Sequence, residues 1–309
     1  NTISAFFGID AAYFALAAIG LNIQFGYTGL LNFGQSAFMA CGAYGLGMTS
    51  QYFGVGMWWG ILIGLALVII LGLLVGIPTL RLRADYLAIV TIATAEIVRL
   101  VVRSVRFKEY FGGSDGINSF SSSFRDLSPF DPGAQYGFRP FQYSGYSLWT
   151  MIVGWLLVIV FSVLVYLLMK SPWGRVVKAI REDEDAAELM GVDTFKFKLW
   201  AFAIGAAIGG IAGSLYASKV GFINPDNFQL QLSILFLAAV VLGGTGSMYG
   251  VIMGGFLVAW IPERFRGFAT RRYFVFGVVL VLVMVFRPQG IIPRRGAAAG
   301  IAKKGESDV

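Results

Sequence analysis

Long stretches without a charged side chain constrain this sequence more than any other feature. The 70 residues between Asp10 and Arg81 carry no charge, and neither do the 30 between Arg139 and Lys170. An apolar run of about 18 to 20 residues is enough to cross a bilayer as a helix. With 57% hydrophobic and only 13% charged residues, the composition excludes a water-soluble globular protein. The sequence therefore predicts an all-α, polytopic helical membrane protein embedded in a lipid bilayer.

The residue types that are missing exclude several classes of chemistry. The chain has no histidine and a single cysteine, Cys41, so it cannot build an imidazole metal site, a Ser-His triad or an internal disulfide. No phosphate-binding loop of the form G-x-x-x-x-G-K followed by Ser or Thr occurs, so any ATP that is used must bind another polypeptide. We expect no catalytic residue, metal or cofactor on this chain. Its basic residues lie in short loops rather than in one patch, which argues against nucleic-acid binding.

Apolar windows and turn residues predict eight hydrophobic segments, or nine crossings if residues 230–262 form two short halves. We adopt nine crossings, because only that number places both the 170–198 loop and the tail on the cytoplasmic side. The arginines between positions 264 and 272 fit this orientation poorly, so a single broken or re-entrant helix over 230–262 is the alternative. The segments are 9–26, 30–49, 56–77, 84–103, 146–169, 199–219, 230–262 and 273–287.

The distribution of basic residues predicts which side the loops face. Lys and Arg favour the cytoplasmic side of a membrane protein. If the 170–198 loop and the tail lie on that side, it carries more basic residues than the other side. The polar 104–145 loop, rich in Gly, Pro and Ser, then lies on the other side and is expected to be irregular. We therefore expect a transmembrane domain over 1–287 and a basic cytoplasmic tail over 288–309.

Two glycine-rich segments, 26–45 and 243–250, interrupt otherwise apolar stretches. Backbone that leaves the helix at membrane depth must be buried in protein or line a cavity, and paired breaks in two halves of a transporter mark a substrate path. Glycine is also common where membrane helices pack closely, so both interpretations stay open. The candidate substrate-path residues in and beside the breaks are Asn22, Gln24, Asn32, Gln35, Ser36, Gly244, Thr245 and Ser247.

A pair of opposite charges lies inside the fourth predicted span. Glu96 and Arg99 are three residues apart, so they can neutralise each other on one helical face. An intramembrane ion pair is costly and is a functional-site candidate by default. Such a pair offers one partner each to the carboxylate and the ammonium of an amino acid. The alternative is a structural pair that reaches toward the outer surface with Arg103.

The stretch 171–198, SPWGRVVKAIREDEDAAELMGVDTFKFK, predicts two short amphipathic helices at the cytoplasmic surface. Pro172 is suited to open the first helix and Gly191 to end the second. A solvated charged loop is the alternative. The small residues that follow Asp185 favour the close approach of a partner.

Here the sequence resembles a family. The pattern D-A-A-x-x-x-G at 185–191 is similar to the E-A-A-x-x-x-G signature with which permeases of ATP-binding cassette (ABC) importers contact their ATPases. Asp185 stands where that signature has glutamate, and its I-x-L-P ending is absent. From about residue 13 to 293 the chain resembles the branched-chain amino acid permeases of the larger-loop type. The strings that carry the resemblance are ALAAIGLNIQFGYTGLLNFGQSAF, PTLRLRADYLAIVTIATAEIVRLV, GGSDGI, GRVVKAIREDEDAAELMGV, VVLGGTGSMYGVIMGG and FRPQGI.

The resemblance implies a subunit of an importer in the bacterial cytoplasmic membrane. Its expected partners are a second homologous permease, two cytoplasmic ATPases that bind ATP and Mg²⁺, and an extracytoplasmic binding protein that meets the 104–145 loop. The cargo would be leucine, isoleucine, valine or a related amino acid, although urea permeases have similar strings. The residues expected to contact the ATPases are Arg175, Arg181, Glu182, Asp183, Asp185, Ala186, Ala187 and Gly191.

Two other classes of protein compete with this interpretation. A stand-alone channel or ion-coupled carrier would need carboxylates buried in several spans, and Glu96 is the one clear candidate. A membrane-embedded enzyme or respiratory subunit would need histidines or clustered acids within its spans. The sequence therefore favours the importer subunit over both.

Overall fold

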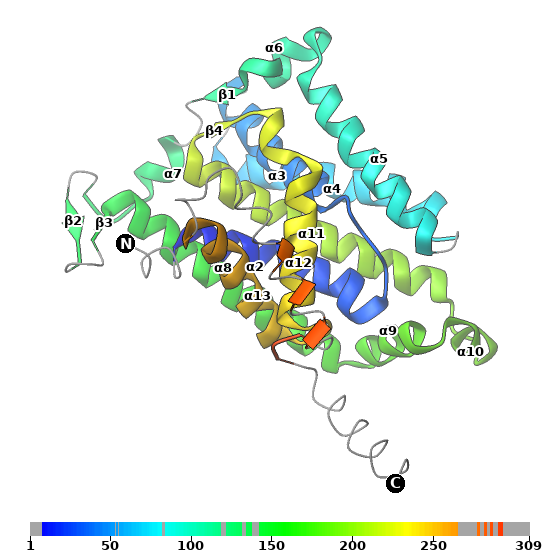
Figure 1. Ribbon diagram of the computed structural model, residues 1–309. Coiled ribbons are helices and arrows are strands. Elements are labelled where there is room, and N and C mark those ends of the chain that lie inside the picture. The colour runs from blue at the N-terminus through cyan, green and yellow to red at the C-terminus, as the bar shows by residue number, and fades with distance from the viewer. Residues whose placement is uncertain are drawn as a thin grey trace.

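Helices make up nearly all the regular structure of this computed structural model (Figure 1). The structure describes residues 8–52, 54, 56–81, 84–118, 122–131, 134–137, 142–264, 277–278, 281–282, 285–286 and 290–292. Most of the expected span 273–287, the tail 288–309 and the arginines at 266–272 lie outside the described residues.

The long helices follow one another with few interruptions. They are α2 (Ile9–Leu21), continued by the π-helix η1 (Asn22–Tyr27), then α3 (Gln35–Tyr52), α4 (Met57–Thr79), α5 (Ala84–Arg103), α8 (Gly145–Lys170), α11 (Thr194–Val220), α12 (Leu230–Gly243) and α13 (Met248–Arg264). The short elements are η2 (Val105–Phe107), α6 (Lys108–Phe111), η3 (Gly113–Asp115), α7 (Ser122–Asp126), α9 (Pro172–Glu182), α10 (Glu184–Leu189) and η4 (Pro225–Phe228). Two antiparallel pairs of strands complete the fold, β1 (Ile117–Asn118) with β4 (Phe222–Ile223) and β2 (Gln135–Tyr136) with β3 (Tyr143–Ser144).

The helical segments confirm the predicted class of polytopic helical membrane protein. Five of them are long and apolar enough to cross a membrane, and 248–261 is a shorter apolar helix. The expected segments 30–49 and 84–103 correspond to α3 and α5, which are helical but are not among those five. The expected pair of halves over 230–262 corresponds to α12 and α13. The five helical segments are Ile9–Tyr27, Met57–Thr79, Gly145–Lys170, Thr194–Val220 and Pro225–Gly243.

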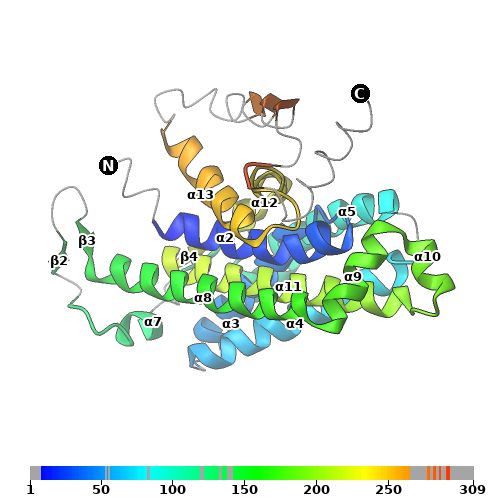
Figure 2. The ribbon, with the colours of Figure 1, turned by 90° about the horizontal axis from the view of Figure 1, so that it is seen from below.

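The long helices divide into a buried inner group and an outer group. Figure 2 shows α2 between α13 on one side and the layer of α8 and α11 on the other. α2 and α11 are mostly buried, whereas α4 and α8 expose apolar side chains such as Leu74 and Leu167 along much of their length. Lipid is as apolar as these side chains, so the outer faces suit a bilayer rather than water.

Close backbone contacts hold the inner group together. A Cβ on Gly42 of α3 would lie 1.9 Å from the carbonyl oxygen of Gly210 in α11. A Cβ on Gly213 would lie 1.9 Å from the carbonyl oxygen of Met39. Real Cβ atoms do not come this close, so only glycine fits at these crossings. The packing interpretation of glycine therefore holds for Gly42, inside the first predicted break.

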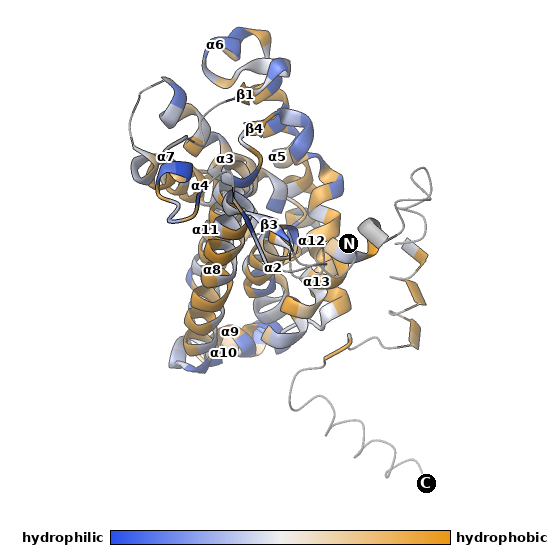
Figure 3. Ribbon diagram, turned by 90° about the vertical axis from the view of Figure 1, so that its left-hand side faces the viewer, coloured by the Kyte–Doolittle hydropathy of each residue, from blue (hydrophilic) through white to orange (hydrophobic). Residues whose placement is uncertain are grey.

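The polar segments gather at two opposite ends of the molecule. Figure 3 shows α6 and β1 at one end and α9 with α10 at the other, with hydrophobic residues along the helices between them. β1 pairs with β4 in the register Ile117↔Ile223 and Asn118↔Phe222, which ties the long polar loop to the turn after α11. The expected 104–145 loop and 170–198 loop therefore lie at opposite ends, as spans between them require.

Candidate functional site

The first glycine-rich segment breaks the helical chain between α2 and α3. The helix widens into η1, and residues 29–34 have no regular structure before α3 begins. Gly29 has a φ of +78°, a left-handed conformation that disfavours any side chain. At Gly34 the chain passes α5 so closely that a Cβ would lie 2.8 Å from the carbonyl oxygen of Thr91. These two glycines let the chain turn sharply inside the protein.

A buried network of amide side chains holds this first break. Asn32 Nδ2 donates to Gln24 Oε1 (2.7 Å) and to Gln35 Oε1 (3.3 Å), and Asn32 Oδ1 accepts from the backbone N–H of Gly34 (2.7 Å). Gln24 Nε2 in turn donates to the carbonyl oxygen of Phe202 in α11 (2.8 Å). Gln24, Asn32 and Gln35 have no exposed surface. Each amide therefore satisfies backbone or side-chain groups that the break leaves without helical partners.

Two hydroxyl groups fix the same segment to its neighbours. Ser233 Oγ of α12 accepts from the backbone N–H of Ser36 (2.9 Å) and bonds to Ser36 Oγ (2.8 Å). Thr91 Oγ1 of α5 accepts from the backbone N–H of Phe33 (3.1 Å). The break is thus bonded to α5, α11 and α12. Thr91 and Ser233 were not among the sequence candidates because nothing in the local pattern connects them to residues more than 50 positions away.

The second break, between α12 and α13, touches the first. Gly244 and Gly246 have φ values of +119° and +77°, and the hydroxyl of Ser247 accepts from the N–H of Gly250 at the start of α13 (3.3 Å). The backbone N–H of Gly246 donates to Asn22 Oδ1 in η1 (2.9 Å). The structure therefore brings the candidate Asn22 into contact with the second break, through a glycine that was not itself a candidate and lies 224 residues away in sequence.

One polar atom at this contact lacks a partner. Asn22 Nδ2 is buried and, among the described residues, donates to no hydrogen-bond acceptor. Leaving such a group unsatisfied costs about 1 to 3 kcal/mol. The other candidate side chains of the first break are occupied by protein groups, so in this conformation they stabilise the break. Contact of any of them with a substrate stays a prediction.

We expect Asn32→Leu to destabilise the fold. The change removes the oxygen that accepts from the buried N–H of Gly34 and the amide that donates to the buried Oε1 atom of Gln24. Loss of both bonds should lower the free energy of unfolding by about 2 kcal/mol or more. Thermal unfolding in detergent, followed by size-exclusion chromatography, measures the effect. Gln51→Leu on the exposed end of α3, the helix that follows the break, is the control and should unfold like the wild type. Equal stability of the two variants would contradict the structural role of Asn32.

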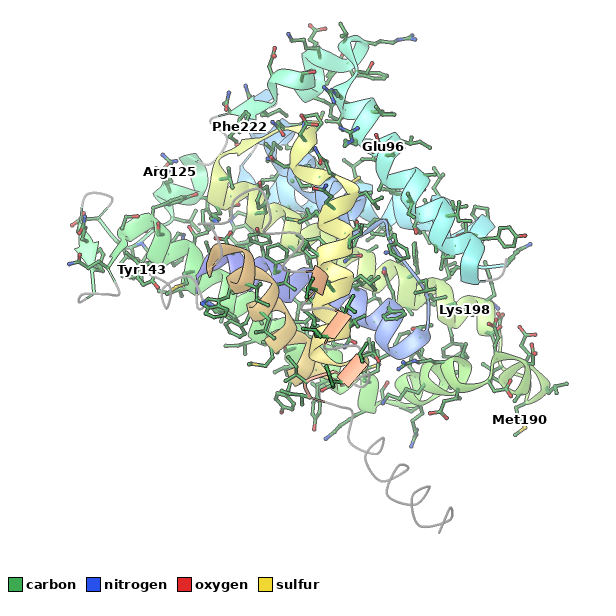
Figure 4. All side chains as sticks on the ribbon, viewed as in Figure 1. Glu96, Arg125, Tyr143, Met190, Lys198 and Phe222 are labelled. Atoms are coloured by element: carbon green, nitrogen blue, oxygen red, sulfur yellow. The ribbon has the colours of Figure 1, made fainter. Side chains whose placement is uncertain are left out.

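The ion pair in α5 forms, but in a larger cluster. Arg99 donates to both carboxylate oxygens of Glu96 (3.0 and 2.5 Å) and to Asp226 Oδ1 in η4 (3.0 Å). Arg103 lies 3.6 Å from the same Asp226 oxygen. The Glu96 side chain is 47% exposed, and Figure 4 places it on the part of α5 toward α6. The described partners of Arg99 thus favour the structural alternative. Asp226, which is 127 residues away, gave no sequence signal.

The 170–198 loop folds into two helices. The Ser171 side chain caps α9 by accepting from the N–H of Gly174, and Pro172 is its first residue. Asp183 caps α10 in the same way, through the N–H of Ala186 (2.9 Å). Gly191 follows α10 with a φ of +83°, which fits the predicted helix end.

The helix pair is anchored to the body of the protein. Val177 and Ile180 of α9 are buried. Lys198 of α11 forms a salt bridge with Glu184, and Thr194 Oγ1 donates to Glu188 Oε1 (2.6 Å). Ahead of α11, the hydrogen bond from the Lys196 side chain lowers the pKa of the Asp193 carboxyl, so the ionised form of this capping group persists to lower pH.

Most of the expected ATPase-contacting residues face outward. Ala187 is buried against the protein and Arg181 is partly buried and turned inward. Leu189 and Met190, at the far end of α10, are 89% and 85% exposed, and Figure 4 shows Met190 at the tip. Apolar side chains this exposed outside the spans indicate a contact surface. The exposed members of the expected set are Arg175, Glu182, Asp183, Asp185, Ala186 and Gly191.

A cavity of about 350 Å³ lies between the first break and the helix pair. Thr28 and Gly29 line it from the break, and Arg81 lines it from the end of α4. Arg181 and Lys198 complete its basic side, so the cavity is polar. Arg81 and Lys198 were not predicted to share a site, because each appeared in sequence as an ordinary charge at a helix boundary.

Sequence similarity assigns these helices and breaks to a known family. A family model described as the permease component of branched-chain amino acid transport systems matches residues 4–285. The chain belongs to this family. The match covers both breaks, the charged cluster and the pair α9 and α10, and it confirms the resemblance predicted from the motifs.

Individual relatives of this permease agree. It is 35% identical to the high-affinity branched-chain amino acid transport system permease protein LivM of Escherichia coli, over 93% of this chain and 71% of the relative. It is 28% identical to a probable LivM of Methanocaldococcus jannaschii, over 91% and 90%. A shorter match, 32% over 45% of each chain, is to the autoinducer 2 import system permease protein LsrC of Photorhabdus laumondii. No solved structure matches the chain.

Family membership fixes the general role of the permease. It is a multi-pass membrane protein and a transport subunit of an ABC system with other subunits, rather than a catalytic enzyme. Within the described residues, no group of three or more Cys, Asp or Glu side chains is placed to hold a metal ion.

Proposed function

We propose that this permease forms half of the translocation path of an ATP-driven importer for branched-chain amino acids in the bacterial cytoplasmic membrane. The observation that carries the proposal is 35% identity over 93% of the chain to a permease named for that transport. The partners are a second homologous permease, two ATPases and an extracytoplasmic binding protein. ATP and Mg²⁺ bind to the ATPases.

The geometry of α9 and α10 supports the ATPase contact. They lie at the end of the molecule opposite α6 and β1 (Figure 3), and the distribution of basic residues makes this the cytoplasmic end. Their exposed surface combines the acids Glu182, Asp183 and Asp185 with the apolar tip Leu189 and Met190. Such a surface offers a partner apolar contact area at the tip of α10 and charged groups beside it.

The opposite end suits the binding protein. There the segment after α5 is folded into η2, α6 and η3, and the salt bridge between Lys108 Nζ and Asp115 Oδ2 (2.6 Å) crosses its turn. The pairing of β1 with β4 fixes this segment to the end of α11. A charged, exposed and internally bonded surface at this end is available to a delivering protein.

Transport then proceeds by alternating access. ATP binding closes the two ATPases, which displace α9 and α10 of both permeases, and the inner helices move so that the path opens to one side at a time. Breaks in helices are where such bundles bend. The path is flanked by the two breaks, which already contact each other through Asn22 and Gly246.

The test is uptake of labelled leucine into vesicles that contain the permease with its partner permease, ATPases and binding protein. We expect uptake that requires ATP and every partner, and no uptake with an ATPase variant that cannot hydrolyse ATP. Uptake of labelled urea instead of leucine would move the substrate to the related urea importers. Leucine uptake by this chain alone would show a carrier or channel and contradict the proposal.

A further inference from the structure

Arg181 connects the cytoplasmic helix α9 to both helix breaks. It is the penultimate residue of α9, and its guanidinium points into the protein. Nη1 donates to the carbonyl oxygen of Gly26 in η1, and Nη2 lies 3.5 Å from Thr245 Oγ1 in the second break. One side chain therefore reaches two segments that are separated by more than 200 residues in sequence.

The two segments meet where Arg181 bonds them. A Cβ on Gly26 would lie 2.7 Å from the backbone nitrogen of Gly246, and Asn22 Oδ1 accepts from that same N–H (2.9 Å). The aliphatic part of Arg181 also packs against the first break, because a Cβ on Gly29 would lie 3.3 Å from Arg181 Cγ. Because these groups are closely packed, a displacement of Arg181 is expected to displace the backbone of both breaks.

Arginine is chemically suited to this position. Its planar guanidinium has five N–H donors and can bond two acceptors in different directions, which the ammonium of lysine cannot do with the same geometry. Gly26 lies in the last turn of η1, where the carbonyl oxygens lack helical partners and carry the partial negative charge of the helix end. The charge of a partly buried guanidinium is therefore stabilised by this carbonyl oxygen.

The rest of α9 connects Arg181 to the exposed tip. Lys178, one turn earlier, donates to the carbonyl oxygen of Met169 (2.7 Å) and lies 5.7 Å from the ring centre of Tyr27 in η1. After Arg181 the chain enters α10 within three residues. A displacement of the exposed end of α10 is thus transmitted to η1 through a short and well-bonded path.

We propose that Arg181 is the positioning residue that couples movement of α9 and α10 to the separation of the two breaks. Arg181 holds the breaks together in the conformation described here and separates them when the ATPases displace α9. The sequence placed Arg181 among the ATPase contacts, which stays a prediction; the structure turns its guanidinium toward the two breaks. This inference rests on the proposed function for the transport step, but the contact itself can be tested without a substrate.

The transport experiment measures leucine imported per ATP hydrolysed by the complete reconstituted complex. We expect Arg181→Met to assemble and hydrolyse ATP, but to import about tenfold less leucine per ATP. Arg181→Lys should recover part of the loss, because it restores the charge near Gly26 but not both bonds. Lys196→Met removes an exposed positive charge at the same end and should behave like the wild type. If Arg181→Met imports as much leucine per ATP as the wild type, the inference is overturned. If Arg181→Met does not assemble, the same result in Arg181→Lys overturns it.

A second experiment uses hydrogen–deuterium exchange on the purified permease. Arg181→Met should exchange about fivefold faster than the wild type at residues 24–30 and 244–248, because loss of about 1 kcal/mol of local bonding raises the open population by that factor. Lys196→Met should not change these segments. Unchanged exchange in Arg181→Met overturns the inference whether or not leucine is transported. Absence of ATP-dependent leucine uptake in the wild type would contradict the proposed function alone.

Discussion

Replacing Gly213 by leucine is expected to prevent the permease from folding. A Cβ at this position would lie 1.9 Å from the carbonyl oxygen of Met39, so α3 and α11 would have to separate. Overpacking of a core typically costs about 1 to 3 kcal/mol, and here the obstacle is backbone that cannot change rotamer. Fluorescence-detected size-exclusion chromatography should show loss of the monodisperse peak.

The control for this prediction is another glycine. Gly56→Leu, before α4, adds the same side chain where nothing lies within 4 Å of the new Cβ, and its peak should match the wild type. A monodisperse and thermally stable Gly213→Leu protein would show that α3 and α11 do not cross as closely as described.

The double variant Leu189→Asp, Met190→Asp is expected to abolish transport by releasing the ATPases. Both side chains are exposed at the tip of α10, so the fold of the permease itself should not change. Loss of these two apolar contacts should weaken binding of the ATPases by about 3 kcal/mol, which lowers their affinity more than a hundredfold. Co-purification of the ATPases with the tagged permease, followed by size-exclusion chromatography, measures the loss.

Leu127→Asp provides the matched comparison. Leu127 is also an exposed apolar residue outside the spans, but it follows α7, away from α9 and α10. ATPase binding should therefore survive that change. Retention of the ATPases by the Leu189 and Met190 variant would instead assign the contact to another surface of the permease.

Local chemistry was sufficient to predict the long helices and the pair α9 and α10. It did not predict the short helices and strands of the 104–145 loop, which was expected to be irregular. Absence of charge located the helices α2, α4, α8 and α11 because burying a charge in a bilayer is costly. Glycine and proline located their interruptions, and the period of apolar residues between Pro172 and Gly191 predicted α9 and α10. These signals act over one or two helical turns, and a single sequence contains them in full.

The contacts of the candidate site could not be predicted in the same way. Asn22 meets Gly246, and Arg99 meets Asp226, across more than 100 residues, and no periodicity records such pairs. In α10, Ala187 is buried while Ala186 is exposed. The sequence could not predict which of the two is buried, because a helix of six residues is too short to show an apolar face in its pattern. Arg181 had the same sequence context as its exposed neighbours, so only the fold could show that it points inward.

The buried bond between Gln24 and Phe202 has a consequence for biosynthesis. The side chain of Gln24 donates to a carbonyl oxygen that is synthesised 178 residues later, and Gln24 has no exposed surface in the folded protein. While the chain is emerging from the ribosome, the amide of Gln24 lies in an apolar segment without this partner, and burying it unpaired is costly. This bond can form only after α11 has been synthesised, so the packing around Gln24 is completed after the insertion of the first helix rather than during it.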